Sequence, residues 1–100
     1  MEKSFNERCY SVLKKVPKGK ITTYKEIARA LHTKAYRAVG NAMNKNSYAP
    51  KVPCHRVIAS DGSIGGFASG TRKKIKMLKK EGIEINNRKI NLKKFFYKLK

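Results

Sequence analysis

The chain has 100 residues, of which 25 are lysine or arginine and 6 are aspartate or glutamate, so its formal net charge is +19. This length suits one domain over residues 1–100, with a modest core, rather than two. The sequence has no apolar run long enough to cross a bilayer and no apolar leader, so we expect a soluble protein without membrane contact. A chain this basic is expected to bind polyanions, and nucleic acid is the first candidate.

The two cysteines and two histidines do not form a metal-binding pattern. Cys9 and Cys54 are not part of a Cys-x-x-Cys pair, and His32 and His55 lack zinc-ligand spacing. Disulfides are rare in unexported chains, so we expect both thiols to be free. The sequence therefore predicts no metal and no cofactor.

The first predicted element is an amphipathic helix from Phe5 to Val16. Its apolar residues recur at steps of three and four, which is one face of a helix. Cys9 lies on that face and is interpreted as a packed core thiol. The segment 17–20, which holds a proline and a glycine, ends this helix with a turn.

A helix-turn-helix is predicted for residues 23–44. Thr23 and Glu26 have the spacing of a capping box, which marks the start of a short helix. A second helix from Ala35 to about Asn44 follows a connection of about three residues, which matches the helix-turn-helix spacing. Many small helical bundles share that spacing.

The second of these helices carries small residues, among them Ala35, Ala38 and Gly40. A thin helix can approach a nucleic-acid backbone closely while Arg37 projects beyond it. The same small residues would also allow close packing between helices. The net charge favours the first interpretation, although Gly40 fits either.

The stretch Pro53-Cys54-His55-Arg56-Val57-Ile58 is the candidate active-site turn, residues 53–58. A cysteine is a useful nucleophile as thiolate, and a neighbouring imidazole or cation favours that form. Most free cysteines are instead small buried hydrophobes. Taken alone, the hexapeptide leaves both interpretations open for Cys54.

The remaining segments are a loop, a basic helix and a tail. Residues 60–70 hold an Asp-Gly turn and a glycine-rich run that lacks the lysine of a phosphate-binding loop. A helix from Thr71 to about Glu81 is expected to place Ile75 and Leu78 inward, with Gly82 as its C-cap. A small hairpin over 83–92 and a tail that packs back on the core complete the basic segment 71–100. The surface of the helix is expected to carry Arg72, Lys73, Lys74, Lys76, Lys79 and Lys80.

At this point the chain resembles a known family, the O6-alkylguanine-DNA alkyltransferases, which repair DNA by direct reversal. The matching segments follow the family's order and spacing and extend over about residues 5–85. They are 21–24, 36–43, Asn46, the hexapeptide 53–58, and Glu81-Gly82. The resemblance implies a mainly α, winged-helix-like DNA-binding bundle with a helix-turn-helix and a short β-hairpin or wing.

The same resemblance assigns roles to individual residues. Arg37 would enter the space left by a flipped nucleotide, and Tyr24 would help to rotate the base outward. Asn46 would brace the turn that carries Cys54. The other contacts to DNA would come from Ala35, Ala38, Gly40 and Met43, and the substrate pocket would be lined by Met43, Val57, Gly66, Phe67, Ala68 and Ser69.

The expected chemistry is a single transfer of an alkyl group, such as methyl, to Cys54. Adjacent side chains diverge, so a water would carry the thiol proton to His55, and Glu81 matches the family carboxylate that orients the imidazole. Tyr24 would protonate the leaving guanine. The thioether product resists hydrolysis, so the protein would act once on O6 of guanine, with O4 of thymine as a second candidate atom.

The expected partner is double-stranded DNA carrying O6-alkylguanine, bound by a monomer in a prokaryotic cytoplasm at the nucleoid. We expect a minimal form without the N-terminal domain that many family members carry. The sequence also departs from the family at Phe67 and Ala68 in the loop, and the tail beyond Leu92 has no clear counterpart. Two alternatives are a non-catalytic alkyltransferase-like protein, disfavoured because Cys54 is present, and a plain winged-helix regulator. A cysteine hydrolase is disfavoured because a separate histidine is missing.

Overall fold

The computed structural model describes residues 4–45, 52–64 and 71–99. Within these ranges the chain is mainly helical, which confirms the predicted fold class. The elements in chain order are α1 (Phe5–Leu13), β1 (Thr22–Thr23), α2 (Tyr24–Ala30), α3 (Tyr36–Asn44), the 3₁₀ turn η1 (Cys54–Arg56), β2 (Val57–Ile58), α4 (Thr71–Lys80) and α5 (Leu92–Phe95).

The helix ends follow local sequence signals. The Thr23 hydroxyl accepts a hydrogen bond from the Glu26 N–H at 3.0 Å, as the predicted cap requires. Gly82 has φ +88°, its N–H donates to the Lys79 carbonyl, and the next N–H, of Ile83, donates to Leu78. These two bonds form a Schellman motif, so the predicted C-cap of α4 is confirmed.

The β structure differs from the expected hairpin. β1 and β2 pair in parallel, with Thr22 opposite Val57 and Thr23 opposite Ile58. Among the residues that the structure describes, antiparallel pairing is limited to isolated bridges, Ser63 with Lys89 and Asn86 with Lys89. Asn86 and Lys89 flank a tight turn and exchange both backbone hydrogen bonds at 2.9 Å. The two residues between them have positive φ, which suits a two-residue turn. The predicted hairpin is therefore present only as this turn and single bridges.

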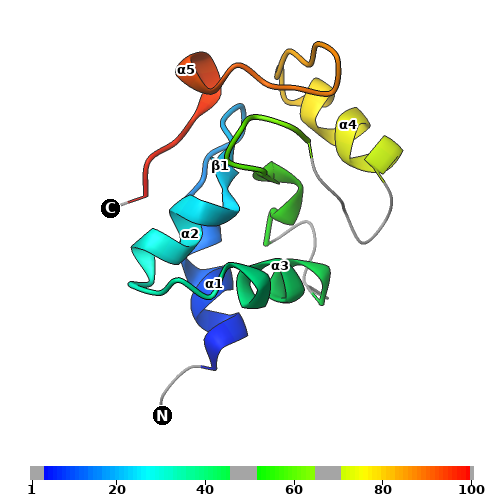
Figure 1. The fold of residues 1–100 in the computed structure, drawn as a ribbon. Coiled ribbons are helices and arrows are strands. Elements are labelled where there is room, and N and C mark those ends of the chain that lie inside the picture. Colours follow the sequence, from blue (N-terminus) through cyan, green and yellow to red (C-terminus); the bar gives the residue numbers. More distant parts are fainter. Residues whose placement is uncertain (1–3, 46–51, 65–70, 100) are drawn as a thin grey trace.

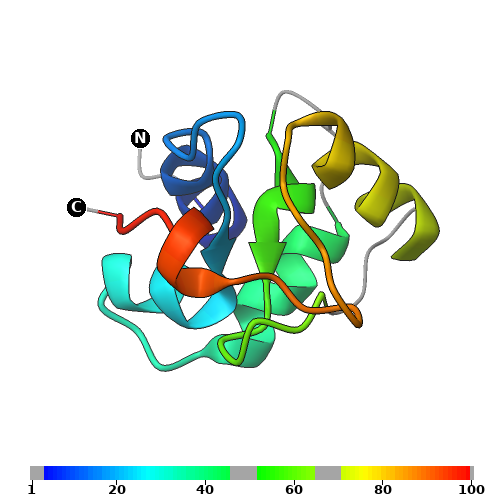
Figure 2. The same cartoon turned by 90° about the horizontal axis from the view of Figure 1, so that it is seen from above.

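Two apolar clusters lie on either side of the strand pair. The first cluster fills the space among α1, α2, α3 and η1, and the second lies between the strands, α4 and the tail. Figure 1 shows the same division, with α1 to α3 at one end of the molecule and α4 and α5 at the other. In the view from above, β2 lies near the middle, with α4 on one side and α1 and α2 on the other (Figure 2).

The tail packs back on the core, as predicted. The Ile21 N–H donates to the Phe95 carbonyl at 2.9 Å, and the Tyr97 N–H donates to the Ile21 carbonyl at 2.7 Å. Phe95 and Leu99 are both buried. The short helix α5 within this segment was not predicted. Among the described residues, no helix is both long and apolar enough to cross a membrane.

Candidate active site

A proline-centred turn presents Cys54. Pro53 has φ −81° and ψ 67°, and the Cys54 N–H donates to the Val52 carbonyl at 2.8 Å, which is the geometry of an inverse γ-turn. The 3₁₀ turn then leads directly into β2. β2, which follows this turn, pairs with β1, and α2 begins at Tyr24 directly after β1. The thiol of Cys54 is almost fully buried, with 5% of the residue exposed.

His55, Glu81 and Arg56 form one hydrogen-bonded cluster. The imidazole Nε2 of His55 lies 2.9 Å from Glu81 Oε2. Arg56 donates to both carboxylate oxygens of Glu81, at 2.9 and 2.7 Å, and to the Val16 carbonyl at 2.9 Å. The structure therefore brings together His55 and Glu81, the pair that the family resemblance implied, and adds Arg56 as a bidentate partner of the carboxylate.

The charges in this cluster fix the protonation of the imidazole. Burial alone would raise the pKa of Glu81, but hydrogen bonds from Arg56 and His55 outweigh it and hold the pKa below its usual value. The ionised carboxylate accepts, so Nε2 of His55 carries the proton. Burial lowers the pKa of His55, and Glu81 offsets only part of that effect. The imidazole is therefore neutral at pH 7, and its Nδ1 is the basic nitrogen.

The charge of Cys54 contributes to the pKa shifts of two other groups, Tyr24 and Lys74. Burial raises the pKa of Tyr24, and negative charge on Cys54 raises it further. Burial lowers the pKa of Lys74 to about 8, and Cys54 opposes that shift. Tyr24 therefore keeps its proton at pH 7.

Lys74 is the main site residue that sequence reasoning missed. It was expected on the basic surface of α4, but it is fully buried, and its Nζ donates to the carbonyls of Val57 and Ile64 at 2.6 Å each. The signal was available, because position 74 lies four residues before the inward-facing Leu78. Because lysine is charged, the residue was nevertheless assigned to the surface of the helix. Ile75, which was expected inward, is only half-buried.

The buried Lys74 predicts a specific pH dependence of stability. Its folded pKa of about 8 lies below its ordinary value of 10.5. Between these values the unfolded chain binds more protons, so the contribution of Lys74 to the free energy of unfolding rises with pH. Urea unfolding of the native chain and of Lys74→Met, from pH 7 to 10.5, should show their difference rising by up to about 3 kcal/mol in favour of the native chain.

The difference between the native chain and the variant cancels the contributions of other titrating groups to the pH dependence of stability. One of them is Cys9, whose pKa burial raises to about 11, so its contribution falls as the pH rises. The exposed neighbour Lys73 provides the control, because Lys73→Met should follow the native curve at every pH. Parallel curves for the native chain and Lys74→Met would contradict the burial of a titrating ammonium group.

Apart from Tyr24, which begins α2, the predicted DNA-contact residues lie on α3 and just before it. Arg37 and Ala35 are exposed, and Ala38 and Gly40 are half-buried. A Cβ added at Gly40 would meet no atom of the described residues within 4 Å, so helix packing against these residues does not require the glycine. Met43 is buried in the cluster that also contains Cys54 and Val57, and its two predicted roles stay predictions.

Five predicted site residues lie outside the described residues. They are Asn46, Gly66, Phe67, Ala68 and Ser69. Their assigned roles stay predictions. In the described ranges no three His, Cys, Asp or Glu side chains are grouped as metal ligands would be.

Comparison with known proteins places the chain in a family. The family description "6-O-methylguanine DNA methyltransferase, DNA binding domain" matches residues 4–83. The chain belongs to this family. Among curated relatives of this alkyltransferase family, it is 46% identical over 87 residues to a bifunctional methyltransferase/endonuclease of Picrophilus torridus, covering 86% of this chain and 29% of that protein. It is also 47% identical over 84 residues to the methylated-DNA–protein-cysteine methyltransferase of Methanosarcina barkeri, covering 83% of this chain and 51% of that protein.

The chain thus spans about half the length of that methyltransferase, and less of the Picrophilus protein. One solved structure, however, matches from end to end. It is S. pombe Atl1 in complex with damaged DNA containing O6-carboxymethylguanine, with TM-score 0.86 and 34% identity, covering 98% of this chain and 99% of that chain. The tail beyond Leu92 therefore has a structural counterpart, which corrects the expectation that it has none.

Proposed function

We propose that this alkyltransferase-family chain repairs DNA by moving an alkyl group from O6 of guanine to Cys54. The observation that carries the proposal is the cluster beside Cys54, in which His55 donates to Glu81 and keeps a basic nitrogen for the thiol proton. A purely structural cysteine would not need a neutral, oriented imidazole next to it. The name of the Methanosarcina barkeri relative supports the same reaction class.

The proposed reaction is one in-line displacement. The thiol proton passes through a water to Nδ1 of His55, and Glu81 stabilises the imidazolium that forms. The thiolate forms a C–S bond with the alkyl carbon, and the C–O bond breaks with its electron pair left on the guanine. Tyr24, which is protonated at pH 7, supplies a proton to that base. The thioether is stable in water, so each molecule reacts once.

An O6 substituent inside a stacked duplex is out of reach of a buried thiol, so the nucleotide must be extruded. Arg37 on the exposed face of α3 is proposed to fill the space that the base leaves. The many exposed lysines would contact phosphates without reading sequence, and affinity should therefore fall steeply with salt. This suits a protein that scans any sequence.

Incubation with duplex DNA that carries labelled O6-methylguanine tests the proposal. The expected result is transfer of up to one equivalent of label to the protein, in the peptide that contains Cys54. Turnover beyond one equivalent, or label retained by the DNA, would contradict it.

A second candidate is binding to the lesion without transfer. It is favoured by the end-to-end match to S. pombe Atl1, whose structure contains DNA with O6-carboxymethylguanine. Tight binding to methylated duplex with no label on the protein would support this candidate. The same labelled duplex therefore separates the two functions.

The role of Arg37 predicts a split between substrates. Arg37→Ala should slow alkyl transfer from duplex DNA by roughly 100-fold, because extrusion costs a few kcal/mol. Transfer from free O6-benzylguanine should change less than about twofold, since no base has to leave a stack. Single-turnover rates on both substrates measure this, and equal losses on both would rule out the extrusion role.

A further inference from the structure

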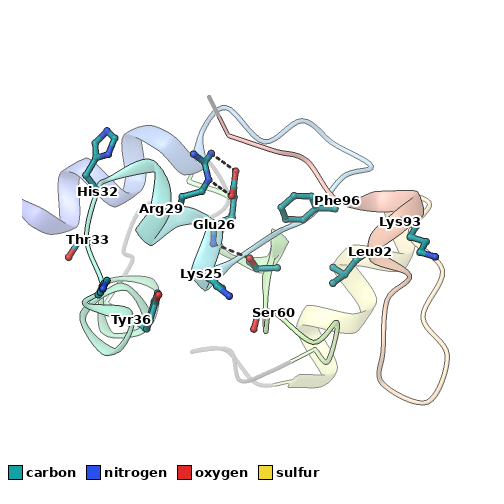
Figure 3. Close-up of a pocket in the computed structure, with 12 residues that line it drawn as sticks. Lys25, Glu26, Arg29, His32, Thr33, Tyr36, Ser60, Leu92, Lys93 and Phe96 are labelled. Atoms are coloured by element: carbon teal, nitrogen blue, oxygen red, sulfur yellow. Dashed lines mark hydrogen bonds and ion pairs between the residues drawn. The ribbon is translucent and has the colours of Figure 1, made fainter.

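A groove separates the helix-turn-helix from the tail. Its volume is about 800 Å³, and we call it the tail groove. Figure 3 shows its walls, with α2 and the turn before α3 on one side and the segment around α5 on the other. It is lined by Thr23, Lys25, Glu26, Arg29, His32, Thr33, Lys34, Tyr36, Ser60, Leu92, Lys93 and Phe96. The family description ends at residue 83, so the tail wall lies beyond the matched domain.

Exposed aromatic side chains are concentrated in this groove. In the described part of the chain, the large apolar side chains that remain exposed are Tyr36, at 48%, and Phe96, at 36%. Both line the tail groove, one from each wall. Exposed rings on opposite walls of one groove are suited to stack on a flat partner.

The groove is also positively charged. Lys25, Lys34 and Lys93 are exposed along it. Its acidic residue, Glu26, is already neutralised by two hydrogen bonds from Arg29, at 2.7 and 2.8 Å, and by the Leu99 N–H at 2.6 Å. The net charge that a ligand meets is therefore positive, which suits phosphates.

The tail groove continues toward the active-site turn. A smaller hollow of about 400 Å³ is lined by Lys25, Tyr36 and Ser60, which also line the tail groove. Its remaining lining residues are Tyr24 and Ala59. A path of basic and aromatic side chains thus runs from Tyr24 to Phe96.

We propose that the tail groove binds a nucleotide of the DNA strand next to the extruded one. Its base would lie between the rings of Tyr36 and Phe96, and its phosphates would contact Lys25 and Lys93. Aromatic platforms with basic side chains are how proteins hold unpaired nucleotides without reading sequence. The inference rests on the proposed binding of damaged DNA and adds the tail as a second contact.

The test compares variants on a methylated duplex that carries 2-aminopurine at positions flanking the lesion. Phe96→Leu keeps an apolar side chain but loses the ring, and should weaken binding roughly tenfold, whereas Phe96→Tyr should bind like the native chain. Lys93→Gln should weaken binding and reduce the salt dependence by about one phosphate contact. Lys15→Gln, at an exposed lysine that does not line the groove, is the control and should weaken binding less than Lys93→Gln does.

The native chain should also change the fluorescence of one flanking 2-aminopurine, and Phe96→Leu should abolish that change. Equal affinities for the native chain and Phe96→Leu would overturn the proposal, as would a loss of self-association in Phe96→Leu without a loss of DNA affinity. The proposed function is tested separately, by transfer from free O6-benzylguanine to the native chain. If the native chain reacts with the free base while Phe96→Leu still binds DNA normally, the proposed groove contact is refuted and the proposed alkyl transfer is not.

Discussion

Cys54→Ser is expected to abolish alkyl transfer altogether, with no label on the protein after prolonged incubation with methylated duplex. A serine hydroxyl at this position is not ionised by a neutral imidazole to the extent that a thiol is, so the displacement loses its nucleophile. Intact-protein mass spectrometry provides the measurement. The native chain should gain the mass of one CH₂ group, and the variant should gain nothing.

The second cysteine provides a matched control. Cys9 is fully buried on α1, and burial raises the pKa of its thiol to about 11, so it is a poor nucleophile at pH 7. Cys9→Ala should lose some stability through a small core cavity but should still accept one equivalent of label. Label on Cys9 in the Cys54→Ser protein would show that the assignment of the acceptor is wrong.

Glu81→Gln is expected to have the second-largest effect, a loss of about 10² to 10⁴ in the single-turnover rate. The amide cannot stabilise an imidazolium on His55, and it can present its donor instead of its acceptor to Nε2. Arg56 would also lose the negative charge of the carboxylate to which it donates two hydrogen bonds. Because the cluster is largely buried, we expect a stability loss of about 3 kcal/mol as well.

Glu84→Gln separates the role of the cluster from a general effect of acidic charge. Glu84 is exposed and pairs with Lys94 on the surface, so its loss should leave both the rate and the melting temperature nearly unchanged. Rates for Glu81→Gln should be measured well below its melting temperature, so that unfolding does not mimic a catalytic loss. A native rate in the folded Glu81→Gln protein would contradict the proposed role of the carboxylate.

Local chemistry made much of the fold predictable. The hydroxyl of Thr23 caps α2 and Gly82 ends α4 because both signals act within a few residues. The apolar stripe that ends at Val16 indicated which face of α1 is buried. The hexapeptide and Glu81 could be paired in advance only through the resemblance to a family, because 26 residues separate His55 from its partner.

The features that sequence reasoning missed depend on contacts between distant segments. Parallel pairing of two-residue strands leaves almost no pattern in the sequence. The carboxylate of Glu26 looked like half of a capping box, yet it binds Arg29 and the Leu99 N–H instead. Lys74 shows the same limit, since the two carbonyls that hold its ammonium group come from β2 and from Ile64.

The attachment of the tail to Ile21, just before β1, and to Glu26 of α2 also determines which fragments of this protein can be studied. A fragment limited to residues 4–83 would match the family yet uncover Ile21, and it would strip Glu26 of its backbone donor. We expect such a fragment to express poorly and to aggregate, because an apolar strand edge would be exposed to solvent. Experiments on the fragment 4–83 would therefore report on a protein that lacks part of its native packing.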